Sequence, residues 1–176
     1  MSKFTEKSLN LYIMSQTQTR PPIMLYTDGA ASGNPGPGGY GVVLECGRWR
    51  KEMSGGFALT TNNRMELLAV IMGLEAVNWQ NAEIHVYSDS TYVVKSVSEG
   101  WLDKWVARGW KKVKNPDLWQ RFLPLYRSHR VTFHWVKGHA GHPQNERCDA
   151  LAVAAYQSGD LVEDTVYVQS AQTLDL

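Results

Sequence analysis

An apolar run that leads into a loop dense in glycine and proline is the feature that most restricts the fold of this chain. Residues 23–28 have the pattern of a buried strand that ends at Asp28, and residues 29–39 are rich in Gly and Pro. A second apolar run begins at once, at residue 40. Burying a carboxylate is costly unless it is hydrogen-bonded or holds a cation. Asp28 is therefore either an ordinary turn residue before Gly29 or part of a functional site.

The composition is that of one ordinary globular domain. The chain has 176 residues, of which 43% are hydrophobic and 20% are charged, so wholesale disorder is excluded. No apolar run reaches membrane-spanning length, and we expect no membrane association. The net charge is only +1, so any nucleic-acid partner must be inferred from how charge is distributed along the chain.

We expect a single domain over residues 21–165. Residues 1–20 are polar and are predicted to be a flexible leader, residues 166–176 are predicted to be a tail, and no regular structure is expected after Ser158. Cys46 and Cys148 show neither metal-ligand spacing nor a disulfide framework, and the leader lacks a secretion pattern. A reduced, cytoplasmic location is expected. No obligate protein partner is evident, and we expect a monomer.

Hydrophobic periodicity predicts alternating strands and helices after an initial meander. Three strands joined by short turns favour antiparallel pairing, and a strand–helix–strand order favours a parallel crossover. The predicted strands cover residues 23–28, 40–44, 49–57 (interrupted at 54–56), 84–87 and 131–136. The predicted helices cover residues 61–79, 91–97 and 145–156, with another beginning at Asn115-Pro116.

This order predicts an α/β fold with a five-stranded mixed sheet, three antiparallel strands followed by two parallel ones, and helices on both faces. Sites in such sheets lie at the carboxyl ends of strands where the connections reverse direction. That point is the junction of the first and fourth strands. Asp28 and Asp89 end these two strands, so we expect the two carboxylates to lie side by side.

Four acids can reach this junction, and each also has an ordinary structural explanation. Glu66 follows Asn63 by three residues, as in a helix capping box. Asp89 could cap the helix after it, and Asp149 is expected in the first turn of the last helix, where acids favour the helix dipole. Asp28 could simply turn the chain.

Taken together, the four carboxylates indicate a cation site. Like charges in one cleft stay ionised only when a cation compensates them. Oxygen ligands without His or Cys at ligand spacing favour Mg²⁺ or Mn²⁺ over Zn²⁺. Two-metal phosphoryl transfer is the chemistry that such a set serves best. His139, between glycines and near the helix that carries Asp149, has the ordinary pKa range of a proton carrier at neutral pH, although a loop histidine can also be a mere surface residue.

Residues 101–130 combine basic residues with tryptophans. The cations Lys104, Arg108, Lys111, Lys112, Lys114, Arg121, Arg127 and Arg130 face one acid after Asp103, namely Asp117. Trp101 and Trp105 are among the interleaved aromatic residues. A pair of amphipathic helices with a solvated basic face would explain the charges alone. The missing acids and the tryptophans favour a nucleic-acid surface.

Five motifs, in order, closely resemble ribonuclease H of the bacterial type 1 family. They are Thr27-Asp28-Gly29, Gly33-Asn34-Pro35-Gly36, Thr61-Asn62-Asn63-Arg64-Met65-Glu66, Ser88-Asp89-Ser90, and the run from Gly138-His139 to Asp149. The resemblance covers about residues 22–165. It implies a ribonuclease H-like fold and endonucleolytic hydrolysis of the RNA strand of RNA/DNA hybrids with Mg²⁺ or Mn²⁺, two ions being expected with substrate bound. The expected products carry a 5′-phosphate and a 3′-hydroxyl.

The resemblance also implies roles for individual residues. The family's metal-binding carboxylates fall on Asp28, Glu66, Asp89 and Asp149, and its loop histidine falls on His139. Positions that read 2′-hydroxyls and base edges match Asn34, Asn62 and Asn63, and a contact to a phosphate of the DNA strand matches Thr61. The expected substrate-binding handle contains Trp101, Lys104, Trp105, Arg108, Lys111, Lys112 and Lys114.

Two departures from the family pattern affect the expected affinity. The basic loop at residues 109–116 is shorter than in the best-known members, which predicts weaker hybrid binding. Thr91 stands where glutamine is common in the family, so the minor-groove contact made by that glutamine is not expected with certainty here. Two alternatives remain: a catalytically weak hybrid-binding module, which intact carboxylates argue against, and a DNA strand-transferase of the same fold, which the fourth acid and the histidine loop argue against.

Overall fold

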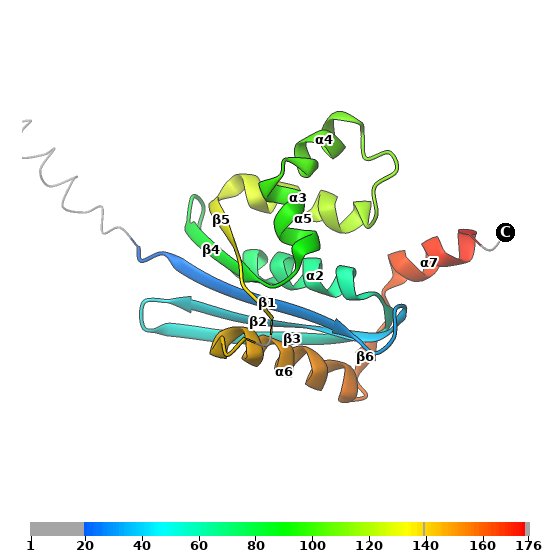
Figure 1. Ribbon diagram of the computed structural model, residues 1–176, viewed down its shortest axis with the longest axis horizontal. Helices are drawn as coiled ribbons and strands as arrows, with labels where there is room; N and C mark the ends of the chain where they lie inside the picture. Colours follow the sequence, from blue (N-terminus) through cyan, green and yellow to red (C-terminus); the bar gives the residue numbers. More distant parts are fainter. Residues whose placement is uncertain (1–19, 139, 175–176) are drawn as a thin grey trace, which may run out of the picture.

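Asp28 lies in a central strand of a six-stranded mixed sheet in the computed structural model, which describes residues 20–138 and 140–174 (Figure 1). The strand order is β5-β4-β1-β2-β3-β6. The predicted leader, apart from Arg20, lies outside the described residues, as does His139. No helix in the described ranges is both long and apolar enough to cross a membrane.

The predicted antiparallel meander is confirmed, with longer strands than the periodicity indicated. β1 (Ile23–Ala31) pairs with β2 (Gly36–Cys46), and β2 pairs with β3 (Trp49–Thr60). The expected interruption of β3 at residues 54–56 is wrong, because these residues keep their pairing with β2. Paired neighbours thus override the weak strand propensity of Ser-Gly-Gly.

The two parallel strands are confirmed, and the structure adds a short third one. β4 (Glu83–Ser88) pairs with β1, and β5 (Arg130–Trp135) pairs with β4. The sixth strand, β6 (Leu161–Val162), pairs in parallel with β3. A strand of two residues is too short to show any alternation, so the predicted count of five strands missed it.

Three helices, α2 (Asn62–Glu75), α3 (Thr91–Ser98) and α5 (Pro116–Ser128), lie over one face of the sheet (Figure 1). On the same side, α4 (Trp101–Ala107) contacts α3 and lies farther from the strands. The main core lies between this face and the helices. α2 is buried on most sides because it lies between β1 and α5. It ends four residues before the predicted Trp79, since the chain turns toward β4 and the Asn81 N–H bonds to the Ser128 carbonyl at 2.8 Å.

α6 (Pro143–Gln157) packs on the opposite face of the sheet, across β1, β2 and β3 (Figure 1). The chain then forms β6 and α7 (Thr165–Leu174), so the expectation of an irregular chain after Ser158 is wrong. The cause is tertiary. Asp164 begins α7 by accepting a bond from the Tyr167 N–H at 3.3 Å, and its carboxylate is held by Arg64 from α2. Local sequence patterns do not reveal such an anchor.

Candidate active site

Asp28 lies inside β1, three residues before its end, whereas the sequence placed it at the end of the strand. It is paired with Gly41 of β2, and β1 continues to Ala31. On its other side the parallel pairing with β4 stops at Tyr26 and Tyr87. Asp28 and Asp89 each follow two residues beyond this last pair. The predicted juxtaposition of the two acids is therefore confirmed by the strand register.

Glu66 is brought to the same place by the tight contact between α2 and β1. A Cβ atom at Gly29 would lie only 2.2 Å from the backbone nitrogen of Glu66, so only glycine permits this approach. α2 begins at its cap Thr61, whose hydroxyl accepts a bond from the Arg64 N–H at 3.4 Å. Glu66 is therefore no partner in a capping box with Asn63, which is itself inside the helix.

The Glu66 carboxylate links α2 to the loop after β4. One oxygen accepts a bond from the Asn62 amide at 2.8 Å, and the other accepts a bond from the Ser90 hydroxyl. Ser90 also caps α3 by accepting a bond from the Val93 N–H at 3.3 Å. Because Ser90 is the cap, the capping explanation for Asp89 is wrong.

Asp149 lies in the second turn of α6. The sequence placed it in the first turn, but the helix begins at Pro143, two residues earlier than predicted, because proline is well suited to the first helical position. The neighbouring Cys148 is fully buried against the sheet. The charge of Asp149 acts on Asp28 from the opposite layer to Glu66. Its explanation as a dipole-favoured first-turn acid is wrong.

The electrostatics of Asp28 show that the four carboxylates act on one another. Burial, and after it the charge of Asp89, raises the pKa of Asp28 to about 8, and Asp149 and Glu66 add to the shift. The Gly29 N–H, 2.7 Å away, is the group that favours the charged form. Burial and Asp89 likewise raise the pKa of Glu66 to about 7, against the bonds from Ser90 and Asn62. The cluster carries more negative charge than nearby protein groups neutralise.

This donor set fits a hard divalent cation that also binds substrate and water. Within the described residues, no group of three or more Asp, Glu, His or Cys side chains is placed so that it could hold one metal ion by itself. Mg²⁺ does not need such a group, since it keeps several waters and is bound through one or two carboxylates plus substrate phosphates. Asp28 and Glu66, whose pKa values are raised first by burial and then by neighbouring carboxylates, match that kind of site.

The loop that carries His139 begins directly at the acids, although His139 itself lies outside the described residues. A Cβ atom at Gly138 would lie 2.4 Å from Oδ2 of Asp89. The Trp135 indole N–H donates to the Asp89 carbonyl at 3.1 Å. The end of β5 and Gly138 therefore pack against Asp89, next in sequence to the predicted proton carrier.

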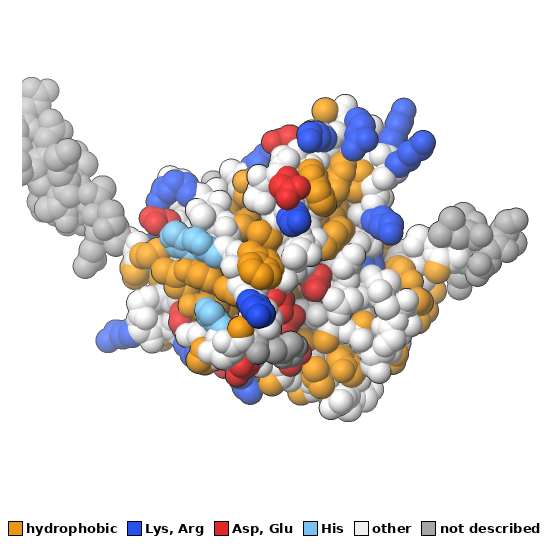
Figure 2. Space-filling model, in the orientation of Figure 1, with side chains coloured by type: hydrophobic (Ala, Val, Ile, Leu, Met, Phe, Trp, Pro, Cys, Tyr) orange, Lys and Arg blue, Asp and Glu red, His pale blue; other side chains and the backbone are white. Residues whose placement is uncertain are grey.

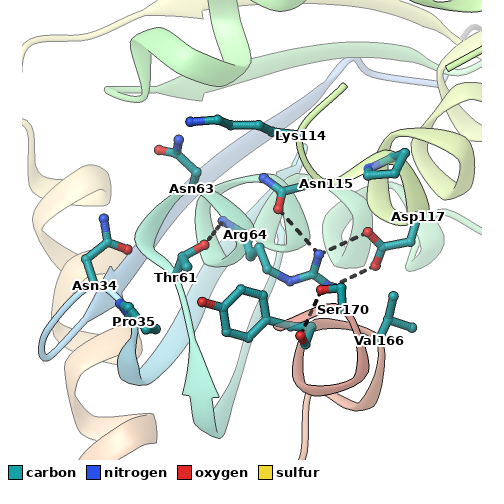
Figure 3. Close-up of a pocket in the computed structure, with 12 residues that line it drawn as sticks. Asn34, Pro35, Thr61, Asn63, Arg64, Lys114, Asn115, Asp117, Val166 and Ser170 are labelled. Atoms are coloured by element: carbon teal, nitrogen blue, oxygen red, sulfur yellow. Dashed lines mark hydrogen bonds and ion pairs between the residues drawn. The ribbon is translucent and has the colours of Figure 1, made fainter. Parts of the chain in front are cut away.

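A pocket of about 520 Å³ lies beside the acids and contains four of the predicted substrate contacts, Asn34, Thr61, Asn63 and Lys114 (Figure 3). The carboxylates do not line it. The link between the two is Asn62, whose backbone N–H donates to the Asn34 side chain at 3.2 Å and whose amide donates to Glu66. Asn62 thus connects the pocket residue Asn34 with the acid Glu66.

The predicted basic handle projects from α4 and the loop after it (Figure 2). Its five cations are exposed, and none forms an ion pair with a carboxylate in the described part of the chain; they are Lys104, Arg108, Lys111, Lys112 and Lys114. Trp105 packs against Trp101 and the buried Trp119, with ring centroids 6.3 and 5.3 Å apart. The tryptophans thus support the handle as well as adjoining its basic face.

The ion cluster of Arg64, Asp117 and Asp164 was not predicted from the sequence. Arg64 is only 3% exposed and makes paired hydrogen bonds of 2.7–2.9 Å to both Asp117 and Asp164. The signal was an arginine within an otherwise apolar helical stripe, which requires a buried partner. The hydrogen bond from Ser90 to Glu66 was also not predicted, because it joins two separate elements of the fold.

Comparisons with known proteins decide the family. A sequence model of RNase H matches residues 20–157. The chain belongs to the ribonuclease H family. The curated Ribonuclease H of Desulforamulus reducens is 55% identical over 155 residues, covering 85% of this chain and 97% of its own. The resemblance to the bacterial type 1 family is confirmed, and this ribonuclease H chain is an enzyme.

Solved structures give the same result for the fold. LC9-RNase H1, described as a type 1 RNase H with the type 2 active-site motif, is 35% identical with a TM-score of 0.73, and 79% of this chain aligns with 74% of that one. LC11-RNase H1, solved in complex with an RNA/DNA hybrid, is 29% identical with a TM-score of 0.57, covering 77% of this chain and 97% of its own.

Proposed function

We propose that this ribonuclease H cleaves the RNA strand of RNA/DNA hybrids internally, with Mg²⁺ or Mn²⁺ as cofactor. The observation that carries the proposal is the group of four carboxylates, in which burial, and after it the charges of Asp89, Asp149 and Glu66, raises the pKa of Asp28 to about 8, near a pocket that contains Asn34, Thr61 and Asn63. The hybrid-bound structure of the relative LC11-RNase H1 supports this substrate.

The four carboxylates would hold the metal, with two ions present when substrate is bound. Bound divalent ions supply an activated water and stabilise the leaving oxygen, and the expected products carry a 5′-phosphate and a 3′-hydroxyl. Ser90 and Asn62 fix both oxygens of Glu66, so this carboxylate keeps its orientation between α2 and the β4–α3 loop. His139 would carry a proton at neutral pH.

Short neutral side chains would distinguish RNA from DNA. Asn34, Asn62 and Asn63 can donate to and accept from 2′-hydroxyls and base edges in the wide minor groove of a hybrid. Thr61 would contact a phosphate of the DNA strand. The exposed cations of the handle, together with Trp101 and Trp105, would bind the DNA backbone at a distance from the acids.

The structure favours this reading over the two alternatives. A mere hybrid-binding module would retain a mutually repelling acid cluster that only destabilises its fold. A DNA strand-transferase would need neither amides placed to read 2′-hydroxyls nor the fourth acid. We also infer that the enzyme works as a monomer in a reducing, cytoplasmic setting, in line with the free thiols of Cys46 and Cys148.

The test uses one labelled RNA strand presented alone, in an RNA duplex and in an RNA/DNA hybrid, each with Mg²⁺ and with chelator. Internal cleavage of the hybrid alone, only with metal, and with 5′-phosphate ends, is the expected result. Tight hybrid binding without cleavage would support the binding module, and joining of DNA ends would support the transferase.

A further inference from the structure

The C-terminal helix α7 forms one wall of the pocket that contains the predicted DNA-strand contact. The pocket of about 520 Å³ has Asn34, Thr61 and Asn63 on one side and Lys114 on another. Its third side consists of Val166, Tyr167 and Ser170 from α7. Figure 3 shows Ser170 and Val166 on the α7 turns that face the helix carrying Arg64.

α7 is held in this position by the arginine that follows Asn63. Arg64 donates from Nε and Nη2 to Asp164 at 2.7 and 2.9 Å, and its guanidinium lies 5.7 Å from the centre of the Tyr167 ring. Asp164 also accepts a bond from the Thr60 hydroxyl at 2.9 Å and is 8% exposed. The helix is therefore fixed to the same turn of α2 that presents the substrate contacts.

The same arginine fixes the opposite wall. Its two terminal nitrogens donate to the Asp117 carboxylate at 2.9 and 2.7 Å. These bonds hold the start of α5 against α2, and Lys114 and Asn115, which directly precede α5, line the pocket there. Arg64 thus sets the spacing of the walls without adding positive charge to the pocket, because one guanidinium paired with two carboxylates leaves the cluster with a net charge of −1.

The chemistry of α7 suits contact with a nucleic-acid backbone. Residues 165–174 contain no acidic side chain, so nothing on the helix repels phosphate. Hydroxyl groups of Ser and Tyr are common donors to phosphate and sugar oxygens. Tyr167 is half-buried and Ser170 is exposed, and both line the pocket. The Ser170 hydroxyl donates to the Tyr167 carbonyl at 2.8 Å, a bond that it would exchange for one to a backbone oxygen of the substrate.

Resting on the proposed function, we propose that α7 is part of the substrate-binding surface and that Tyr167 and Ser170 contact the backbone of the DNA strand held at Thr61. These contacts are neutral, so they release no counterions. They add affinity without adding to the salt dependence of binding, whereas each phosphate-paired lysine contributes a slope of about 0.9 in a plot of log affinity against log salt.

The test compares the variant Tyr167→Phe/Ser170→Ala with the control Thr165→Ala, which removes a hydroxyl from the same helix outside this pocket. Binding to an uncleaved hybrid is measured in chelator at several salt concentrations. The variant Lys114→Gln is measured in parallel. The double variant should raise Kd about threefold to tenfold with an unchanged salt slope. Lys114→Gln should lower the slope, and the control should match the wild type.

Steady-state kinetics on the same variants show whether the contacts act in substrate binding or in the chemical step. Loss of a contact made equally in the ground and transition states raises KM and leaves kcat unchanged. Wild-type Kd and KM in the double variant, with an unchanged melting temperature, would overturn the role of α7 while the proposed function stood. Absence of hybrid binding or cleavage in the wild type would instead overturn the proposed function. A shallower salt slope in the double variant would contradict neutral contacts.

Discussion

Asp28 and Asp89 follow the last paired residues of two adjacent parallel strands by the same number of positions, and the charge on Asp89 is the largest carboxylate contribution to the raised pKa of Asp28. Sheet register, rather than flexible loops, sets this relationship. The acids are thus held close together in the folded protein whether or not a cation is bound, and the fold bears the cost of their repulsion. Removing one of these charges should therefore change the measured stability of the metal-free protein.

Asp28→Asn should stabilise the metal-free protein at alkaline pH. The pKa of Asp28 rises from 3.8 to about 8 on folding, so the folded state holds this proton more tightly than the unfolded state. The stability from Asp28 is therefore complete below about pH 4 and is lost as the pH rises to about 8. Urea unfolding in chelator should give a gain of at least about 1 kcal/mol at pH 8 and a smaller gain at pH 5.

The control for that measurement is Asp160→Asn, which changes an exposed acid far along the chain. Added Mg²⁺ should shrink the advantage of Asp28→Asn, because the cation stabilises the wild type alone. A constant difference between wild type and variant from pH 5 to pH 8 would show that the repulsion is not present.

Arg64→Met should be strongly destabilising, because it leaves Asp117 and Asp164 without their shared partner. Removing one member of a buried ion pair costs about 3–5 kcal/mol. Urea unfolding measures the loss, with Arg50→Met as the control. Arg50 pairs with Glu45 and Glu52 at the surface, where such pairs contribute about 1 kcal/mol or less. Equal effects of the two substitutions would contradict the central role of Arg64.

Gly138→Ala should raise the Mg²⁺ concentration needed for activity. The added Cβ would lie 2.4 Å from Oδ2 of Asp89, so the carboxylate or the loop at Gly138 must shift, and we expect the carboxylate to change its position. We expect an activity loss of about 10-fold to 100-fold at low Mg²⁺, partly recovered at high Mg²⁺, and little change in melting temperature. A metal dependence identical to that of the wild type would show that Asp89 tolerates the shift.

His139→Ala should slow turnover by about 100-fold or less, because a proton carrier assists the reaction without holding the metal. The measurement is kcat on a hybrid substrate, with His129→Ala as a control at the far end of α5. A loss as complete as that from removing a carboxylate would mean that His139 does more than carry a proton.

The sequence predicted the central sheet well because its signals were local. Apolar runs and glycine-containing turns indicate β1 to β3, and strand–helix–strand order indicates the parallel β1–β4 pair that places Asp28 beside Asp89. Motif residues such as Asn34, Thr61 and Asn63 could be assigned to one surface before their pocket was known, and the pocket does bring them together.

The parts that could not be predicted depend on contacts between distant segments. α7 is anchored by the ion pair of Asp164 with Arg64, 100 residues apart in sequence, and β6 is held by its pairing with β3. No periodicity in residues 158–174 reveals either contact. The exact turn that carries Asp149 depended on where α6 begins, and helix boundaries are weakly encoded in sequence. The roles of Ser90 and Arg64 likewise appear only when α2, α3 and α7 are packed together.

The most direct test of the carboxylate site separates binding from cleavage in Asp28→Asn. A gel or anisotropy assay gives the Kd for a hybrid, and the same samples with Mg²⁺ give the cleavage rate. We predict a Kd within about threefold of the wild type, because the handle and the pocket are untouched, and no measurable cleavage. Cleavage at the wild-type rate by Asp28→Asn would contradict the assignment of this cluster as the catalytic metal site.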